Sequence, residues 1–147
     1  MATNYSPEFQ WMCIRKTSSF LYRQRKVHKF FDKHPLNVKN VNSIRYNGLV
    51  DPKAVGVQPA ENGKGVVVTH HKKGMITDYK KSNRPATNKV RVTLDKNAAA
   101  VVTSVGRLVD SHGRKQHVNL ARRRASKILR GQRPIPKRAS KKGRVQA

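Results

Sequence analysis

The sequence predicts an α+β fold: a small antiparallel β-sheet followed by two helices, with basic loops and a basic C-terminal tail. Residues 53–58 and 64–70 flank an Asn-Gly turn, and this arrangement is typical of a β-hairpin. Residues 89–94 alternate between polar and apolar side chains, as expected of a half-buried strand. After Leu94 the spacing of apolar residues changes from two to nearly four, which predicts helices.

The N-terminal part of the sheet is predicted from an apolar run. The segment 9–15 (FQWMCIR) has apolar side chains at odd and even positions, which favours a strand buried on both faces. Residues 17–19 supply a turn, and 19–24 is expected to return as a second strand of a hairpin. Trp11 and Tyr22 are then interpreted as core residues.

The last predicted strand, 89–94, and the first helix are expected to share one core. Lys89 and Arg91 are expected on the solvent side of the strand. Asp95 or Asn97 is expected to cap a helix that runs to about residue 110. Gly113 is suited to ending it. The core side is expected to comprise Val90, Val92 and Leu94 of the strand, with Ala98, Val101, Val102, Val105, Leu108 and Val109 of the helix.

A second helix is predicted over residues 117–130. Gly131 is interpreted as its C-terminal stop, and Pro134 and Pro136 prevent it from resuming. Its narrow apolar face comprises Val118, Ala121, Ala125, Ile128 and Leu129, while Arg122, Arg123, Arg124, Lys127 and Arg130 spread over the rest.

These elements suggest one domain with basic appendages. Residues 1–8 are interpreted as an N-terminal extension, 9–131 as a globular domain and 132–147 as a basic tail. Two segments inside the domain, 25–47 and 71–88, lack periodicity and are rich in basic and turn residues. Long irregular segments in a compact domain are usually functional, so both are predicted to be loops that face a partner.

The charge of the chain indicates what that partner is. Lys and Arg number 33 against 7 Asp and Glu, which gives a formal net charge of +26, and the calculated pI is about 11.4. Such an excess of positive charge points to a large anionic partner. Nucleic acid is favoured over a membrane, because no apolar run is long enough to span a bilayer.

Catalytic and metal-binding functions are disfavoured by the residue types present. The lone cysteine, Cys13, is interpreted as a buried core residue, and it excludes an internal disulfide or a multi-cysteine zinc site. His70 and His71 would point to opposite faces of a strand, so they are not expected to bind one metal ion together. No carboxylate pair and no phosphate-binding glycine loop is present, so no enzyme activity, cofactor, metal or small-molecule substrate is expected.

The second helix carries the chemistry that favours RNA. Five cations within residues 122–130 have no acid beside them, and each phosphate that they neutralise would release counterions. A solvated helix face, a calmodulin-type target and a membrane-surface helix are the alternatives, but the apolar face is narrow and rich in Ala. Tyr46 is the best candidate for stacking on an unpaired base, with a packing role as the alternative.

Several blocks of the sequence resemble the twenty-eighth family of eukaryotic large-subunit ribosomal proteins, L28e. They are QWMCIRKTSSFL, SIRYNGLV, KAVGVQPAENGKGVVV, VRVTLDKNA and RRASKILRGQRP, and they keep the family's order across most of residues 10–134. The resemblance implies a structural protein of the cytosolic 60S subunit that binds ribosomal RNA beside neighbouring ribosomal proteins, with nucleolar passage during assembly. A longer ribosome-assembly factor family with a related N-terminal domain and a chromatin protein are the rival interpretations.

The predicted RNA-binding residues are basic side chains together with Tyr46 and Asn47, which follow Arg45. Eight of them lie inside matching blocks and have their role supported by the resemblance, and these are Arg15, Lys16, Arg45, Tyr46, Asn47, Lys64, Arg123 and Arg130. The remainder rest on charge and position, and they are Arg25, Lys26, Lys39, Lys72, Lys73, Lys80, Lys81, Arg84, Arg91, Arg114, Lys115, Arg122, Arg124, Lys127, Arg133, Lys137 and Arg138.

Overall fold

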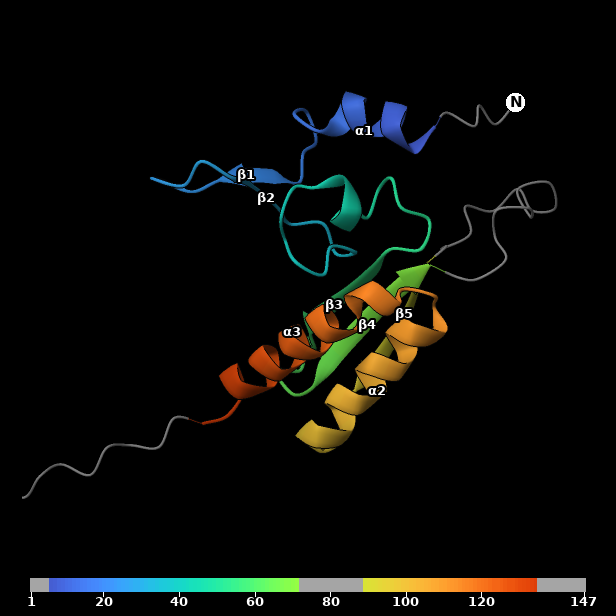
Figure 1. Cartoon of the computed structure of the whole chain (residues 1–147). Helices are drawn as coiled ribbons and strands as arrows, with labels where there is room; N and C mark the ends of the chain where they lie inside the picture. The colour runs from blue at the N-terminus through green and yellow to red at the C-terminus, as the bar shows by residue number, and fades with distance from the viewer. Residues whose placement is uncertain (1–5, 72–88, 135–147) are drawn as a thin grey trace, which may run out of the picture.

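The computed structural model describes residues 6–71 and 89–134 (Figure 1). Within these ranges the chain forms three α-helices and two small antiparallel sheets, which confirms the predicted α+β class. Most of the predicted loop 71–88 and of the N-terminal extension and C-terminal tail lies outside the described residues.

The first element corrects the prediction for the N-terminal segment. Residues 9–15 were expected to form a buried strand, but Pro7–Ile14 is the helix α1, and none of its residues is fully buried. Ser6 caps it by accepting a hydrogen bond from the Phe9 amide (3.3 Å), and Pro7 and Glu8 occupy the first turn. A short apolar run does not distinguish helix from strand by periodicity, so the capping residues decide.

The predicted hairpin between 9–15 and 19–24 is therefore wrong. The strand β1 (Leu21–Arg23) pairs instead with β2 (Phe30–Asp32), and together they form a two-stranded antiparallel sheet. Tyr22 and Phe31 lie opposite each other in this sheet, and their rings stack with centroids 5.4 Å apart. Both rings are half-buried, so Tyr22 packs at the margin of the fold.

The segment 25–47, expected to be an irregular loop, is partly core. It contains β2 and the short 3-10 helix η1 (Ile44–Tyr46). Asp32 is buried, and its carboxylate accepts hydrogen bonds from the His34 amide (2.8 Å) and the Asn37 side chain (2.9 Å). These bonds fold the chain so that Leu36 and Val38 are buried.

The second sheet has three strands in the order β3–β4–β5 and agrees closely with the prediction. The strands are β3 (Val55–Pro59), β4 (Val66–His71) and β5 (Lys89–Leu94). The Asn-Gly turn closes the β3–β4 hairpin, with Gly63 at a φ of 68°. Val57, Val68 and Val92 lie side by side across the sheet, and β5 alternates in burial as expected.

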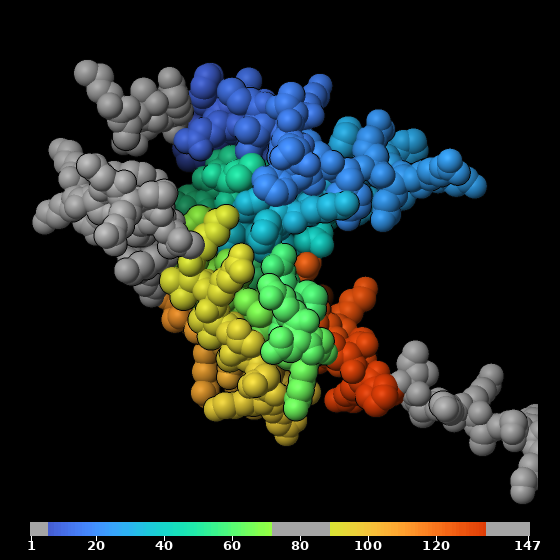
Figure 2. Space-filling view, turned by 180° about the vertical axis from the view of Figure 1, so that it is seen from behind, coloured from blue at the N-terminus to red at the C-terminus, as the bar shows by residue number. Residues whose placement is uncertain are grey.

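Two helices cover one face of this sheet (Figure 1). They are α2 (Ala98–Ser111), which follows Asn97 as predicted and ends before Gly113, and α3 (Val118–Gly131). The buried core between helices and sheet comprises Val38, Val55, Val57, Val66, Val68, Val101, Val105, Val109, Ala121 and Ala125. The opposite face lies towards the viewer in Figure 2, where side chains of the β3–β4 hairpin and of β5 reach the surface.

The far face of the sheet is covered at one end by the segment after β2. The carbonyl group of Pro35 occupies the position that a side chain at Gly56 would take, so this strand residue has room only for hydrogen. The C-terminal end of α3 is held separately, because the Gln132 side chain both donates to and accepts from the Gly65 backbone (2.8 and 2.9 Å).

Candidate RNA interface

The solvent side of α3 is strongly cationic. Ala121 and Ala125 are fully buried against the sheet, and this fixes which side of the helix faces outward. The helix contains no acidic residue. Five exposed cations on α3 and just beyond it are called here the α3 basic surface, and they are Arg122, Arg123, Lys127, Arg130 and Arg133.

Arg122 is positioned by a glycine of the neighbouring helix. Gly106 is buried on the side of α2 that faces α3, and the guanidinium of Arg122 lies where a side chain at Gly106 would be. The missing side chain therefore lets the arginine lie flat across α2. Sequence reasoning did not single out Gly106, since its role depends on a residue of another helix.

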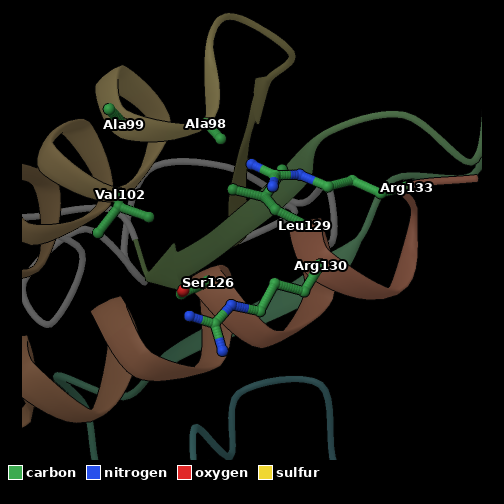
Figure 3. A pocket seen from close by; sticks show the side chains of 7 residues that line it. All are labelled: Ala98, Ala99, Val102, Ser126, Leu129, Arg130 and Arg133. Atoms are coloured by element: carbon green, nitrogen blue, oxygen red, sulfur yellow. The ribbon is translucent and has the colours of Figure 1, made fainter.

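A groove of about 440 Å³ lies between α2 and α3. Figure 3 shows small apolar side chains of α2 on one side and the two guanidinium groups of Arg130 and Arg133 on the other. Its lining, which we call the α2–α3 groove, comprises Ala98, Ala99, Val102, Ser126, Leu129, Arg130 and Arg133. A second hollow of about 570 Å³ shares three of these residues and adds Arg122, Arg123 and Lys127. No acidic side chain lines either hollow.

The groove shows a limit of the sequence prediction. Ala98 and Val102 were expected on the core side of their helix. Val102 does pack against the core, but both residues are only half-buried and they also line the groove. Their four-residue spacing on α2, matched by Ser126 and Arg130 on α3, is the signal that could have indicated a shared surface.

Arg124 faces inward, unlike its neighbours on α3. Its Nε donates to the carbonyl of Val57 (2.6 Å) and its Nη1 to that of Val38 (3.1 Å), so the side chain joins α3 to the edge strand β3. Burial lowers the pKa of this guanidinium from its usual value, and nearby Tyr22 opposes the shift. The RNA contact at Arg124 stays a prediction, and two of the five guanidinium N–H donors are used within the protein.

Arg114 likewise has partners within the protein. Its guanidinium forms an ion pair with Asp51 and donates a hydrogen bond to the Lys53 carbonyl (3.4 Å). In residues 6–71 and 89–134 this is the one ion pair recorded. The side chain therefore fastens the segment after α2 to the segment before β3.

Tyr46 is half-buried and Asn47 is fully buried. The Tyr46 ring packs against the core, with its centroid 5.3 Å from that of His117 and 5.3 Å from Lys39 Nζ. Asn47 is buried, and its side-chain oxygen accepts hydrogen bonds from the backbone amides of Leu49 (2.8 Å) and Val50 (3.2 Å). Both residues therefore have packing or turn-forming roles, and base stacking at Tyr46 stays a prediction.

The remaining predicted residues are exposed or lie outside the described ranges. Besides the α3 basic surface, the exposed ones are Arg15, Lys16, Arg25, Lys26, Lys39, Arg45, Lys64, Arg91 and Lys115. Those that lie outside the described residues are Lys72, Lys73, Lys80, Lys81, Arg84, Lys137 and Arg138.

The histidines and the helices show no metal-binding or membrane-spanning arrangement in the described part of the chain. Within the described ranges no group of three His, Cys, Asp or Glu side chains is placed to hold a metal ion. His70 instead packs its ring against His112, with centroids 4.9 Å apart. None of the helices in the described part of the chain has the length and apolar character needed to cross a membrane.

The fold and this surface define a small, strongly basic α+β protein. Residues 9–131 match the family model described as the Ribosomal L28e protein family. The chain is similar to the Caenorhabditis elegans large ribosomal subunit protein eL28, with 40% identity over 123 residues, or 83% of this chain and 86% of that protein. It is also similar to the Schizosaccharomyces pombe protein of the same name, with 33% identity over 133 residues, or 88% and 94% of the two chains.

The chain therefore belongs to the L28e family of eukaryotic ribosomal proteins. It is a structural ribosomal constituent, not an enzyme.

Proposed function

We propose that the protein is a constituent of the cytosolic 60S subunit and stabilises ribosomal RNA by binding its phosphates. The observation that carries this proposal is the α3 basic surface, where five exposed cations gather with no acid among them. The names of its relatives, which are large-subunit proteins, support the choice of subunit.

Phosphate binding by such a surface follows from counterion release and from guanidinium geometry. Each neutralised phosphate frees condensed counterions, and the planar fork of Arg meets phosphate oxygens bidentately. Phosphate contacts carry no sequence code, and the major groove of an A-form helix is too deep and narrow for side chains to read. The protein is therefore proposed to recognise RNA shape.

A second basic region lies on another part of the molecule. The β1–β2 hairpin projects away from the three-stranded sheet (Figure 1), and its turn carries Arg25 and Lys26. Lys26 has a φ of 60°, in the left-handed region that tight turns often use. Two separated basic regions would hold RNA segments together that otherwise repel each other, which supports a role in subunit assembly.

The experiment is a salt titration of the full chain with a structured ribosomal RNA fragment. If about ten phosphates are neutralised, log K falls against log salt with a slope near −7 to −9. Changing Arg122, Arg123, Lys127 and Arg130 together to Ala is expected to make this slope shallower by about 3. Arg124 is left intact because it supports the fold.

A charge-matched variant controls for net charge. It changes four exposed cations away from both the α3 basic surface and the β1–β2 hairpin to Ala, and these are Lys53, Lys89, Lys96 and Arg107. Its slope is expected to stay within about one unit of the unaltered value. Equal losses in the two variants, or a slope near zero for the unaltered chain, would overturn the proposed role of α3.

The cellular assignment is tested by sedimentation of a lysate. Co-migration with 60S particles and polysomes after a high-salt wash supports a stable subunit protein. Recovery only with nucleolar precursors would indicate an assembly factor, and recovery with chromatin would contradict both. Brief nucleolar residence, which the proposal includes, predicts a nucleolar fraction that disappears when ribosome synthesis is blocked.

A further inference from the structure

The α2–α3 groove combines two kinds of surface that phosphate binding alone does not require. One wall is apolar and comes from Ala98, Ala99 and Val102, which lie on a single turn of α2. The opposite wall carries the guanidinium groups of Arg130 and Arg133 (Figure 3). Phosphates gain nothing from an apolar wall, so the occupant must have an apolar face as well as negative charge.

An unpaired nucleotide has this combination of properties. Its base is a flat ring that packs on apolar side chains and on guanidinium planes, while its phosphates attract the surrounding cations. Leu129 extends the apolar wall onto α3, and the hydroxyl of Ser126 offers a donor and an acceptor for a base edge. The adjoining hollow brings Arg122, Arg123 and Lys127 within reach of the flanking phosphates.

We propose that the α2–α3 groove receives one unpaired, extruded nucleobase of the bound RNA, a bulge or loop nucleotide, while the α3 basic surface holds its flanking phosphates. This inference rests on the proposed RNA-binding function and makes it more specific. Duplex RNA alone would leave the groove empty.

A protein segment fits the groove less well. Helical peptides dock through apolar side chains spaced over two or more turns, whereas the apolar wall here spans one turn of α2, from Ala98 to Val102. All the charged side chains that line the groove and the adjoining hollow are cationic, so a peptide would also have to be acidic. Charge and size both favour a nucleotide.

The test compares two RNA probes on the full chain at one salt concentration. One is a blunt RNA duplex, and the other is the same duplex with a single bulged 2-aminopurine nucleotide. We expect the bulged probe to bind about tenfold more tightly, since one stacked base contributes on this scale. The fluorescence of the 2-aminopurine is expected to change on binding, because its ring passes from water into the groove.

A matched pair of variants locates the effect. Ala99→Leu fills the groove from the exposed side of α2, and Ala100→Leu adds the same side chain to an exposed neighbour that does not line it. Leu and Ala are both strong helix formers, so both variants should fold. Ala99→Leu is expected to abolish the preference for the bulge and to retain duplex binding, while Ala100→Leu keeps both.

Other results would distinguish failure of the base site from failure of the RNA-binding function, and both from binding of a protein partner. Equal binding of bulged and blunt duplex, with a steep salt slope, overturns the base site and leaves the phosphate-binding function intact. A shallow slope for both probes overturns the function as well. The groove would belong to a protein partner if an amphipathic helical peptide of Glu and Leu bound the unaltered chain but not Ala99→Leu, with no preference for the bulge.

Discussion

The Nε atom of Arg124 donates a hydrogen bond to the carbonyl oxygen of Val57 at 2.6 Å, which joins α3 to the edge strand β3. An edge strand exposes backbone groups that have no partner within the sheet. Arg124 supplies a partner to Val57 and also to Val38, in the segment beside that edge. One side chain thus connects three parts of the chain.

Arg124→Ala is therefore expected to destabilise the fold. Hydrogen bonds from a charged donor contribute about 1.5–3 kcal/mol, and the Val57 and Val38 carbonyls would lose their partner. Urea unfolding should show a loss of this size. Arg123→Ala, which alters an exposed neighbour on the same helix, is expected to change the free energy of unfolding by no more than about 0.5 kcal/mol.

The same two variants should exchange their order in RNA binding. Arg123→Ala removes one exposed cation, so the salt slope should become shallower by about 0.7–0.9. Arg124→Ala should leave the salt slope unchanged under conditions in which the variant protein is folded. A larger slope change for Arg124→Ala than for Arg123→Ala would show that Arg124 contacts RNA after all.

Gly56 and Gly106 are expected to differ in how strongly an added methyl group destabilises the fold. At Gly56 the new carbon would meet the backbone carbonyl of Pro35, which has no freedom to move away. Gly56→Ala should therefore lower the free energy of unfolding by about 3 kcal/mol. At Gly106 the obstacle is the end of the flexible Arg122 side chain, so Gly106→Ala should change stability by no more than about 1 kcal/mol.

Chemical unfolding of both glycine variants checks this contrast. Similar losses for the two would mean that the α2–α3 contact is as rigid as the contact between β3 and the Pro35 segment. The Gly106→Ala protein also serves to detect movement of Arg122, since a displaced guanidinium should weaken RNA binding without unfolding the chain.

Two buried histidines predict a loss of stability in mild acid. Burial lowers the pKa of His34, with Asp32 opposing the shift and Lys89 and His71 adding to it. Burial also lowers the pKa of His117, and nearby Arg114 and Arg45 lower it further. The Leu36 amide donates to His34 Nδ1 (3.3 Å), an arrangement that requires this nitrogen to be unprotonated.

The sign follows from which state binds protons first. As the pH falls below 6.5, the ordinary histidine value, the unfolded chain is protonated before the folded one, so stability decreases until the lowered folded pKa values are passed. Urea midpoints should therefore fall between about pH 7 and about pH 5.5. Replacing His34 and His117 together by Gln should flatten this dependence, and an unchanged midpoint in the unaltered protein would contradict the assignment.

The sequence was sufficient for elements whose pattern is long. The alternation in β5 and the four-residue spacing in α2 and α3 extend far enough to specify both the element and its buried face. The short segments failed, because α1 has apolar residues all round and β2 is defined by pairing with β1 rather than by its own composition. Their structure depends on capping and on tertiary contacts.

The residues of the candidate site likewise include some that the sequence pattern predicts and one that depends on tertiary contacts. The exposed cations of α3 follow from helical periodicity, since they lie opposite Ala121 and Ala125. The inward turn of Arg124 depends on Val57 and Val38, which are 67 and 86 residues away in sequence. Position 124 directly precedes the buried Ala125, and this adjacency to the apolar face is the only local indication of its role.

The exposed state of Cys13 gives a direct test of the N-terminal helix. As part of a strand buried on both faces this thiol would be protected, whereas on α1 it is exposed. A maleimide should therefore modify the native chain once, at a rate close to that in urea, because exposure controls access to the thiolate. Cys13 is the only cysteine, so any label reports on this position alone. Modification that occurs only after unfolding would contradict the exposed helix and would favour the buried strand.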